Sequence, residues 1–102
     1  MIHVIAEIQI AEGKITEFLA EFHAIVPAVR AETGCIEYGP NTDVDVGLPR
    51  QMAYRPTIVT VVEKWESLEH LQAHLVAPHM LEYRAKVKDL VLGAELRILE
   101  PA

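Results

Sequence analysis

The stretch that decides the fold is Val61–Met80, which reads VVEKWESLEHLQAHLVAPHM. The residues around its start, Thr57–Val62, are β-branched, and this composition favours a strand that ends at Trp65 and is buried on both faces. Ser67 then has the hydroxyl needed to cap a helix, and Glu69 places negative charge in the first turn, where the helix dipole favours it. The stretch therefore predicts a buried strand that runs directly into a helix.

Helical spacing divides this helix into two faces. Four apolar residues predict a buried stripe, and they are Leu68, Leu71, Leu75 and Val76. His70 and His74 lie one turn apart on a different face, which is the spacing of a metal-binding pair. Because no third ligand follows from the sequence, we expect no metal site. Pro78 is predicted to begin a further helical segment, in which its missing N–H is harmless.

The first half of the chain also divides into elements. Ile2–Ile10 alternates with the period of a strand packed on one side. From Ile15, apolar residues recur at helical spacing and predict a helix of roughly 15–18 residues. Pro27 should kink this helix or tighten its end. Gly34 should end it as a left-handed C-cap.

The second half begins with a strand at Cys35–Tyr38 that bends or bulges at Gly39–Asn41. Residues 43–56 form a connection long enough to suggest a functional role. After the histidine-bearing helix, Gly93 is expected to end the last helical segment. Residues 94–99 alternate as a final strand.

The predicted order is strand, helix, strand, strand, helix, strand. With right-handed crossovers it gives an α+β fold of the ferredoxin-like, split βαβ type, in which a four-stranded antiparallel sheet carries its helices on one face. Residues 1–102 are expected to form a single domain. Ile5 points to the helix-free face, and one side of the third strand adds further large apolar groups there. A second copy related by two-fold symmetry is the simplest cover for such a patch.

The composition of the chain argues against some classes of binding partner. The 102 residues are 51% hydrophobic and 24% charged, with a net charge of −6 and a pI near 5.3. This acidic balance argues against nucleic acid or an anionic membrane as partner. The single cysteine, Cys35, excludes an internal disulfide, and no signal peptide or membrane-spanning stretch is recognised. We therefore expect a cytoplasmic protein.

Two motifs carry a family resemblance. Glu32–Tyr38 and Glu63–Ser67, the latter leading to Ala73–Leu75 and Pro78–Met80, resemble the antibiotic biosynthesis monooxygenase (ABM) family over nearly the whole chain. The resemblance implies a homodimer that forms a dimeric α+β barrel, with a ligand cavity between each sheet and its helices. It also implies oxidation of a small phenolic or quinol-like aromatic by molecular oxygen, with neither metal nor flavin.

The resemblance also implies site residues. Trp65 would stack on the substrate or donate its N–H, and His74 or His79 would act as a base. Val61 stands where phenol-oxidising relatives carry an asparagine, and Arg84 is the nearest candidate for their arginine in the last helix. The predicted substrate-binding set is Val61, Arg84, Phe22 and Tyr83.

Two other functions stay open from the sequence. Haem-degrading relatives place an asparagine near the end of the first strand, where Ile8 stands here, but His74 and His79 keep haem binding or degradation as an alternative. The other alternative is a dimer without catalytic activity that binds a small metabolite.

Overall fold

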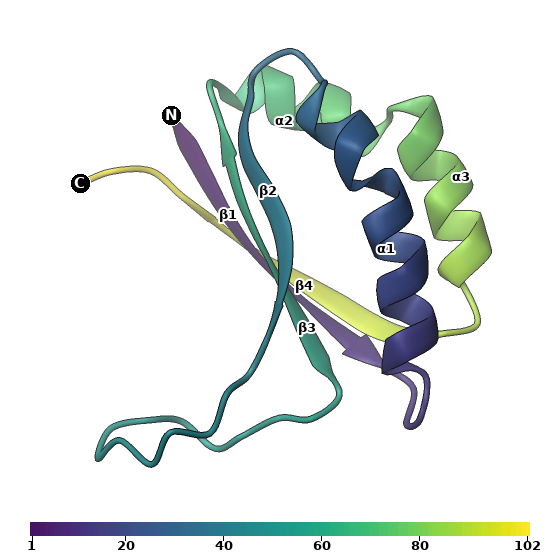
Figure 1. Cartoon of the computed structure of the whole chain (residues 1–102). Helices are drawn as coiled ribbons and strands as arrows, with labels where there is room; N and C mark the ends of the chain where they lie inside the picture. Colours follow the sequence, from purple (N-terminus) through teal and green to yellow (C-terminus); the bar gives the residue numbers. More distant parts are fainter.

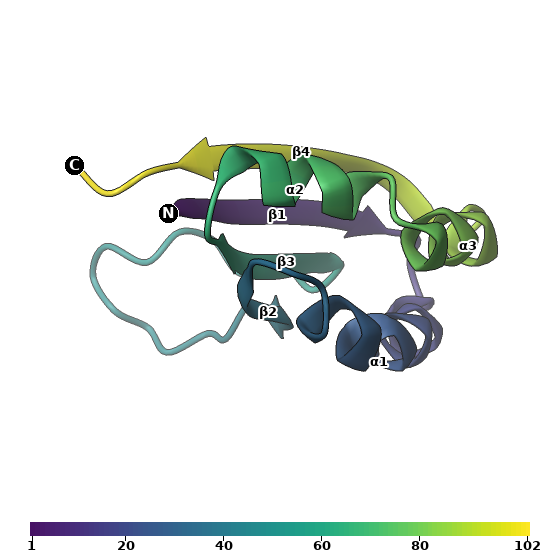
Figure 2. The ribbon, with the colours of Figure 1, turned by 90° about the horizontal axis from the view of Figure 1, so that it is seen from above.

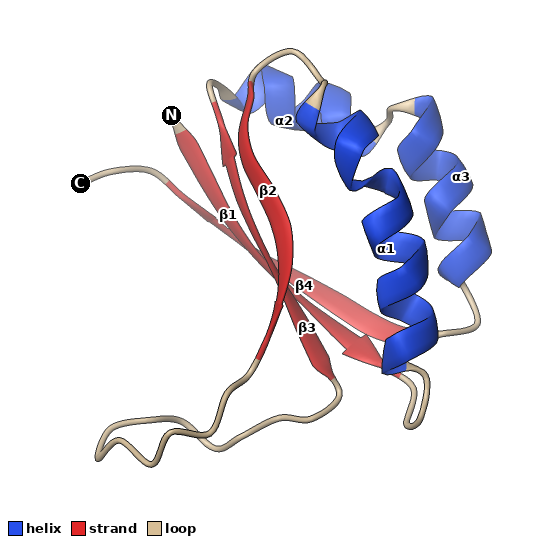
Figure 3. Cartoon of the chain, in the orientation of Figure 1, coloured by secondary structure: helices blue, strands red, loops and turns tan.

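The computed structural model describes residues 1–102 and contains four strands and three helices. In chain order these are β1 (Ile2–Ile10), α1 (Ile15–Arg30), β2 (Cys35–Thr42), β3 (Ile58–Trp65), α2 (Leu68–Leu75), α3 (Pro78–Val87) and β4 (Val91–Leu99) (Figures 1 and 3). The strands form one sheet in the order β2-β3-β1-β4, and every neighbouring pair is antiparallel. The predicted ferredoxin-like α+β fold is confirmed.

All three helices lie on one side of the sheet, as predicted (Figure 1). Viewed from above, α1 lies on the β2 side of this layer and α3 on the β4 side (Figure 2). Ser67 caps α2 by accepting a hydrogen bond from the backbone N–H of His70, and Pro78 occupies the start of α3. Both local predictions are confirmed. No helix combines the length and the apolar character needed to cross a bilayer.

Strand β3 alternates strictly between two environments. Val59, Val61, Glu63 and Trp65 are buried beneath the helices, whereas the residues between them are only partly buried. In the single chain β3 is therefore fully buried on one face only, and burial of the other face requires the second copy predicted from the sequence. The continuous β-branched run hid this alternation, because Ile58, Thr60 and Val62 share the strand preference of their inward-facing neighbours.

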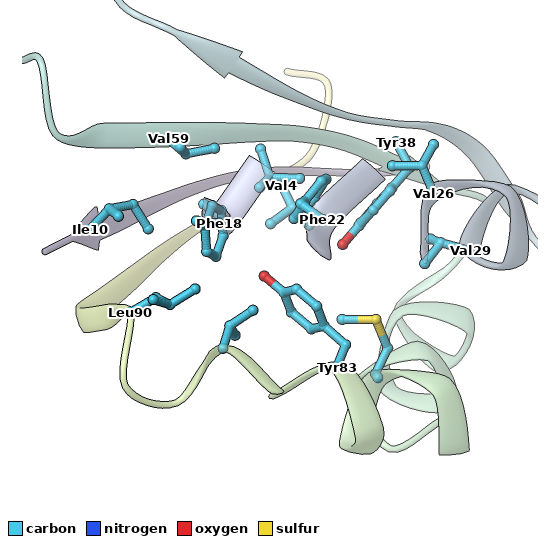
Figure 4. Packing of buried hydrophobic residues seen from close by; sticks show 14 of the residues in the cluster. Val4, Ile10, Phe18, Phe22, Val26, Val29, Tyr38, Val59, Tyr83 and Leu90 are labelled. Carbon is cyan, nitrogen blue, oxygen red and sulfur yellow. The ribbon is translucent and has the colours of Figure 1, made fainter. Parts of the chain in front are cut away.

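An aromatic cluster joins the sheet to α1 and α3. The Phe22 ring stacks on Tyr38 with the ring centroids 5.5 Å apart and meets the edge of Tyr83 at 5.9 Å. Phe18 extends the cluster towards β4 (Figure 4). These contacts fix the spacing between the helical layer and the sheet.

Several predicted details of the first half differ in the structure. Helix α1 continues through Pro27 to Arg30. Gly34 adopts the left-handed conformation, with φ of 84°, but it lies in the turn beyond the helix end, where Ala31 is the C-cap. The irregularity in β2 falls between Cys35 and Glu37 rather than at Gly39–Asn41, whose residues pair regularly with β3.

The second half brings two further corrections. Helix α3 ends at Val87, and Gly93 lies inside β4, where it pairs with Gln9 beside a bulge. In α2 the buried residues are Leu71 and His74, while Leu68 and Val76 at its two ends are exposed. The buried stripe is thus rotated towards His74, because that imidazole has a partly buried polar partner described below.

The long connection, residues 43–57, projects away from the sheet (Figure 1). Arg55 holds the start and the end of this connection together. Its guanidinium donates to Asp43 at 3.0 and 3.1 Å and to Glu7 of β1 at 2.9 Å. The prediction of a functional role for this segment is not tested by its geometry.

Candidate functional site

A cavity of about 520 Å³ lies between the sheet and the helical layer. Its wall is drawn from all four strands and all three helices, and 12 of its 16 lining residues are hydrophobic. The four others are Glu63, His74, Arg84 and Lys88. A mostly apolar cavity with a few converging polar groups, in the range of about 300–1,000 Å³, is the usual form of a small-molecule site.

Glu63 is the carboxyl group of this cavity. It occupies an inward-facing position of β3, and only 6% of the residue is exposed. Its Oε1 accepts a hydrogen bond of 2.9 Å from the indole N–H of Trp65, and no cationic side chain pairs with it. Burial raises the pKa of Glu63 to about 7, against the lowering effect of the Trp65 bond. The group therefore changes charge near neutral pH.

A second carboxylate, Glu32, joins the two predicted histidines. It lies in the turn after α1, and its Oε2 accepts from His74 Nδ1 at 2.9 Å and from His79 Nε2 at 2.7 Å. This bond to Glu32 is the reason that a histidine can occupy the buried face of α2. Burial lowers the pKa of His74 in spite of the neighbouring Glu32, so the imidazole is neutral at pH 7.

The bonding pattern shows which atoms face the cavity. His74 bonds through Nδ1 and Glu63 through Oε1, yet no fully buried side-chain nitrogen or oxygen lacks a partner. His74 Nε2 and Glu63 Oε2 are therefore accessible, and both residues line the cavity. With Nδ1–H donated to a carboxylate, Nε2 is the acceptor of the neutral ring. The cavity thus offers two proton acceptors.

Two tyrosine hydroxyls supply donors. Tyr38 and Tyr83 line the cavity from β2 and α3, and their hydroxyls point into the space between the sheet and α3 (Figure 4). Burial raises the pKa of both phenols well above the ordinary value, and the charge of Glu63 adds to this effect at Tyr38. Both hydroxyls therefore stay protonated and can donate hydrogen bonds at neutral pH.

The structure brings five of the seven predicted site residues to the cavity wall. These are His74, Arg84, Tyr83, Val61 and Phe22. Trp65 and His79 do not line it. The Trp65 indole is fully buried, with its ring 4.7 Å from that of His74, and His79 bonds Glu32 outside the cavity. How each residue acts towards a ligand stays a prediction.

Sequence reasoning missed Glu63, Glu32 and Tyr38 as site residues. Glu63 had a visible signal, because it places a charge in phase with Val59, Val61 and Trp65 on the buried side of a strand. Glu32 had none, since it lies 42 and 47 residues from the two histidines that it joins.

No cluster of three or more His, Cys, Asp or Glu side chains is arranged to hold a metal ion. The two histidines of α2 with metal-pair spacing bond different groups. The Ser67 hydroxyl lies 2.7 Å from His70 Nδ1, whereas His74 bonds Glu32.

The fold and the cavity together define a class: a small ferredoxin-like α+β protein with a largely apolar cavity between its sheet and its helices. Comparison with known proteins identifies the family of the chain. The profile of the family described as "Antibiotic biosynthesis monooxygenase" matches residues 1–86. The chain belongs to this family.

A relative of known sequence agrees with this assignment, and solved structures share the fold. The chain is 42% identical over 103 residues to the protein of Escherichia coli (strain K12) named "Probable quinol monooxygenase YgiN", with 99% of this chain and 98% of that protein covered. Among solved structures, a conserved protein from Methanosarcina mazei Go1 superposes with a TM-score of 0.84 at 24% identity, covering 99% and 92% of the two chains. Rv0793 from Mycobacterium tuberculosis gives 0.81 at 25% identity, covering 99% and 94%.

Proposed function

We propose that this protein is a monooxygenase that oxidises a small quinol-like aromatic with molecular oxygen and without a bound cofactor. The observation that supports this most directly is the cavity itself, whose apolar wall holds two proton acceptors beside two phenol donors. The name of the 42% identical relative, a probable quinol monooxygenase, points to the same substrate class.

The chemistry needs little from the protein. Removing a hydroxyl proton turns a quinol into an electron-rich quinolate that can itself pass one electron to oxygen. The protein must bind the ring, take the proton and exclude water from the radical pair. The apolar wall serves binding and exclusion, and Glu63 or His74 accepts the proton.

The electron balance requires no outside reductant. The semiquinone and superoxide combine at a ring carbon to give a hydroperoxide. Loss of water from that carbon leaves a hydroxyquinone, so that one quinol and one O₂ give one hydroxyquinone and one H₂O. The two electrons for the second oxygen atom come from the substrate.

Labelled oxygen tests this proposal. Purified protein, stripped of metal and flavin, is mixed under ¹⁸O₂ with 1,4-naphthohydroquinone prepared by anaerobic reduction of the quinone. We expect the protein to accelerate oxygen uptake above the protein-free rate and to place one ¹⁸O atom in the hydroxyquinone. Unlabelled quinone with hydrogen peroxide would indicate a simple oxidase. Binding without oxygen uptake would indicate the metabolite-binding alternative.

Haem binding is the alternative function that His74 and His79 suggested. A haem iron would need His74 Nε2, the ring atom open to the cavity, whereas His79 is held by Glu32 outside it. Because this one candidate ligand belongs to a residue that is only 2% exposed, we expect haemin to give no saturable Soret shift. A titration that produced a saturable Soret shift, lost in His74→Ala, would contradict this expectation.

The helix-free face of the sheet supports a homodimer. Ile5, Ile58 and Val62 lie on this face and are only partly buried in the single chain. A two-fold copy packed on them would remove apolar surface from water. Light scattering after size-exclusion chromatography should give twice the chain mass of 11.4 kDa. A monomer at micromolar concentration would contradict the dimer.

A further inference from the structure

We infer that Glu63 is the general base that takes the hydroxyl proton of the bound quinol, and that Trp65 is a positioning residue that acts through Glu63. This inference rests on the proposed quinol oxidation and deepens it. It differs from the sequence-based expectation, in which a histidine is the base and the indole contacts the substrate.

The position of the two carboxyl oxygens supports this role. Oε1 is engaged by the Trp65 N–H at 2.9 Å, whereas Oε2 makes no hydrogen bond to another side chain, and the residue lines the cavity. A bond on one oxygen fixes the carboxyl plane, so the other oxygen is held at the cavity wall in one orientation. The indole is itself confined by packing, because the residue is 0% exposed and its ring lies 4.7 Å from the His74 ring.

The surroundings of Glu63 keep it usable as a base. The titratable or charged groups near Glu63 or in the same cavity are Glu32, Cys35, Tyr38, His74, Tyr83, Arg84 and Lys88. None of these pairs with it as a cation at salt-bridge distance. A carboxylate fixed by a cation would hold its charge and accept a proton poorly, whereas one held only by an indole N–H changes charge near neutral pH.

His74 is suited to a different task. Its ring lies between Trp65 and Tyr38, at centroid distances of 4.7 and 5.3 Å, and only 2% of the residue is exposed. Burial opposes the imidazolium that a histidine base would form. We therefore assign Nε2 the role of a neutral hydrogen-bond acceptor that orients the substrate.

The proton returns within one turnover. Glu63 takes the hydroxyl proton as the quinolate forms, and the quinolate then combines with O₂ to give a ring-bound peroxide anion. Protonated Glu63 gives its proton to the terminal peroxide oxygen. This proton transfer regenerates the Glu63 carboxylate. The O–O bond then breaks as the ring C–H proton leaves, and the departing hydroxide takes up that proton, so that water and the hydroxyquinone are released.

Rate–pH profiles of two variants test the inference. Oxidation of 1,4-naphthohydroquinone is followed by oxygen uptake from pH 5.5 to 9, with the protein-free rate subtracted at each pH. The wild-type kcat should rise with pH through about 7, because the base must be ionised. Glu63→Gln should lower kcat by about 100-fold or more and abolish this rise, with the affinity for 1,4-naphthoquinone retained. Trp65→Phe removes the bond that lowers the pKa of Glu63, so its rise should move to higher pH.

The matched control is Glu37→Gln, an exposed carboxylate on the neighbouring strand that pairs with Lys64 outside the cavity. Its rate and profile should equal those of the wild type. If Glu63→Gln keeps the wild-type rise, the base assignment is overturned while the proposed function stands. If Trp65→Phe leaves the rise in place, the positioning role is overturned. A wild-type protein that oxidises no quinol overturns the proposed function and this assignment together.

Discussion

Two neighbouring residues of β3 carry charged side chains in very different environments, because they lie on opposite faces of the strand. Glu63 points inward, is 6% exposed and bonds only the Trp65 indole. Lys64 points outward, keeps 38% of its side chain exposed and pairs with Glu37 at 3.2 Å. In the single chain the outward charges keep contact with water and cost the fold little. The inward carboxyl is buried without a counter-charge, which disfavours folding, and we connect this unfavourable burial with function.

The largest expected difference is in the free energy of unfolding lost when an inward-facing or an exposed side chain is truncated. Trp65→Ala should lower the free energy of unfolding by about 3–5 kcal/mol, because the indole is fully buried and its loss leaves a cavity. Leu81→Ala on α3 is the control, since 54% of that residue is exposed, and it should cost less than about 1 kcal/mol. Urea unfolding followed by circular dichroism, at one fixed protein concentration, gives both values. Equal costs would contradict the assigned burial.

A pair of glycines extends the contrast to the backbone. Gly34 and Gly13 both have positive φ, at 84° and 77°. A Cβ at Gly34 would lie 2.3 Å from His70 Cγ, whereas a Cβ at Gly13 would meet nothing within 4 Å. Gly34→Ala should therefore cost about 2–4 kcal/mol and Gly13→Ala about 1–2 kcal/mol, as measured by urea unfolding. A Gly13→Ala variant as unstable as Gly34→Ala would show that the left-handed backbone, and not the His70 contact, dominates.

The charge contrast predicts opposite effects of removing two carboxylates. Burial raises the pKa of Glu63 from 4.5 to about 7, so between these values the folded state binds more protons than the unfolded state. Its contribution to stability therefore falls as the pH rises from about 4.5 to about 7. Glu63→Gln should match the wild type near pH 4 and exceed its unfolding free energy by roughly 2–3 kcal/mol at pH 8.

Glu37→Gln serves as the control for this experiment. Because it removes an exposed ion pair, it should lower stability slightly and should not exceed the wild type at pH 8. Unfolding curves at pH 4, 6 and 8 would measure the difference. A Glu63→Gln variant no more stable than the wild type at pH 8 would mean that the carboxyl is ionised in the folded protein without penalty.

The smallest expected effect belongs to the outward pair itself. Lys64→Met should change the free energy of unfolding by less than about 1 kcal/mol, because both partners are well exposed. Added salt should make the variant and the wild type still more alike. A loss above 2 kcal/mol, measured by urea unfolding, would show that the outward face is covered more completely than in the single chain.

The strand and helix pattern followed from the sequence because it depends on local periodicity. The alternation of Ile2–Ile10 and the Ser67 cap could be recognised from neighbouring residues alone. Errors arose where two distant segments meet. Gly93 suggested a helix end, but its position is set by pairing with Gln9 of β1. Likewise, His74 was placed off the buried stripe of α2 because its partner, Glu32, lies 42 residues away.

The candidate site could be predicted only in part for the same reason. Val61, Phe22, Tyr83 and Arg84 were expected from the family resemblance, and they line the cavity. The alternation of the strand indicated that Glu63 faces the interior. The bond between Glu63 and the Trp65 indole was not, because side chains two residues apart on a strand share a face without necessarily touching.

The Glu32 bridge has a consequence for how a ligand reaches the cavity. By bonding one imidazole from α2 and one from α3, this carboxylate fastens the junction of the two helices to the turn after α1. These bonds restrain the helices on the His74 side of the cavity. Lys88 and the 53% exposed Leu96 also line the cavity and have no comparable restraint. We expect a ligand to enter the cavity beside β4. The backbone amides there should exchange their hydrogens faster than the amides around Glu32.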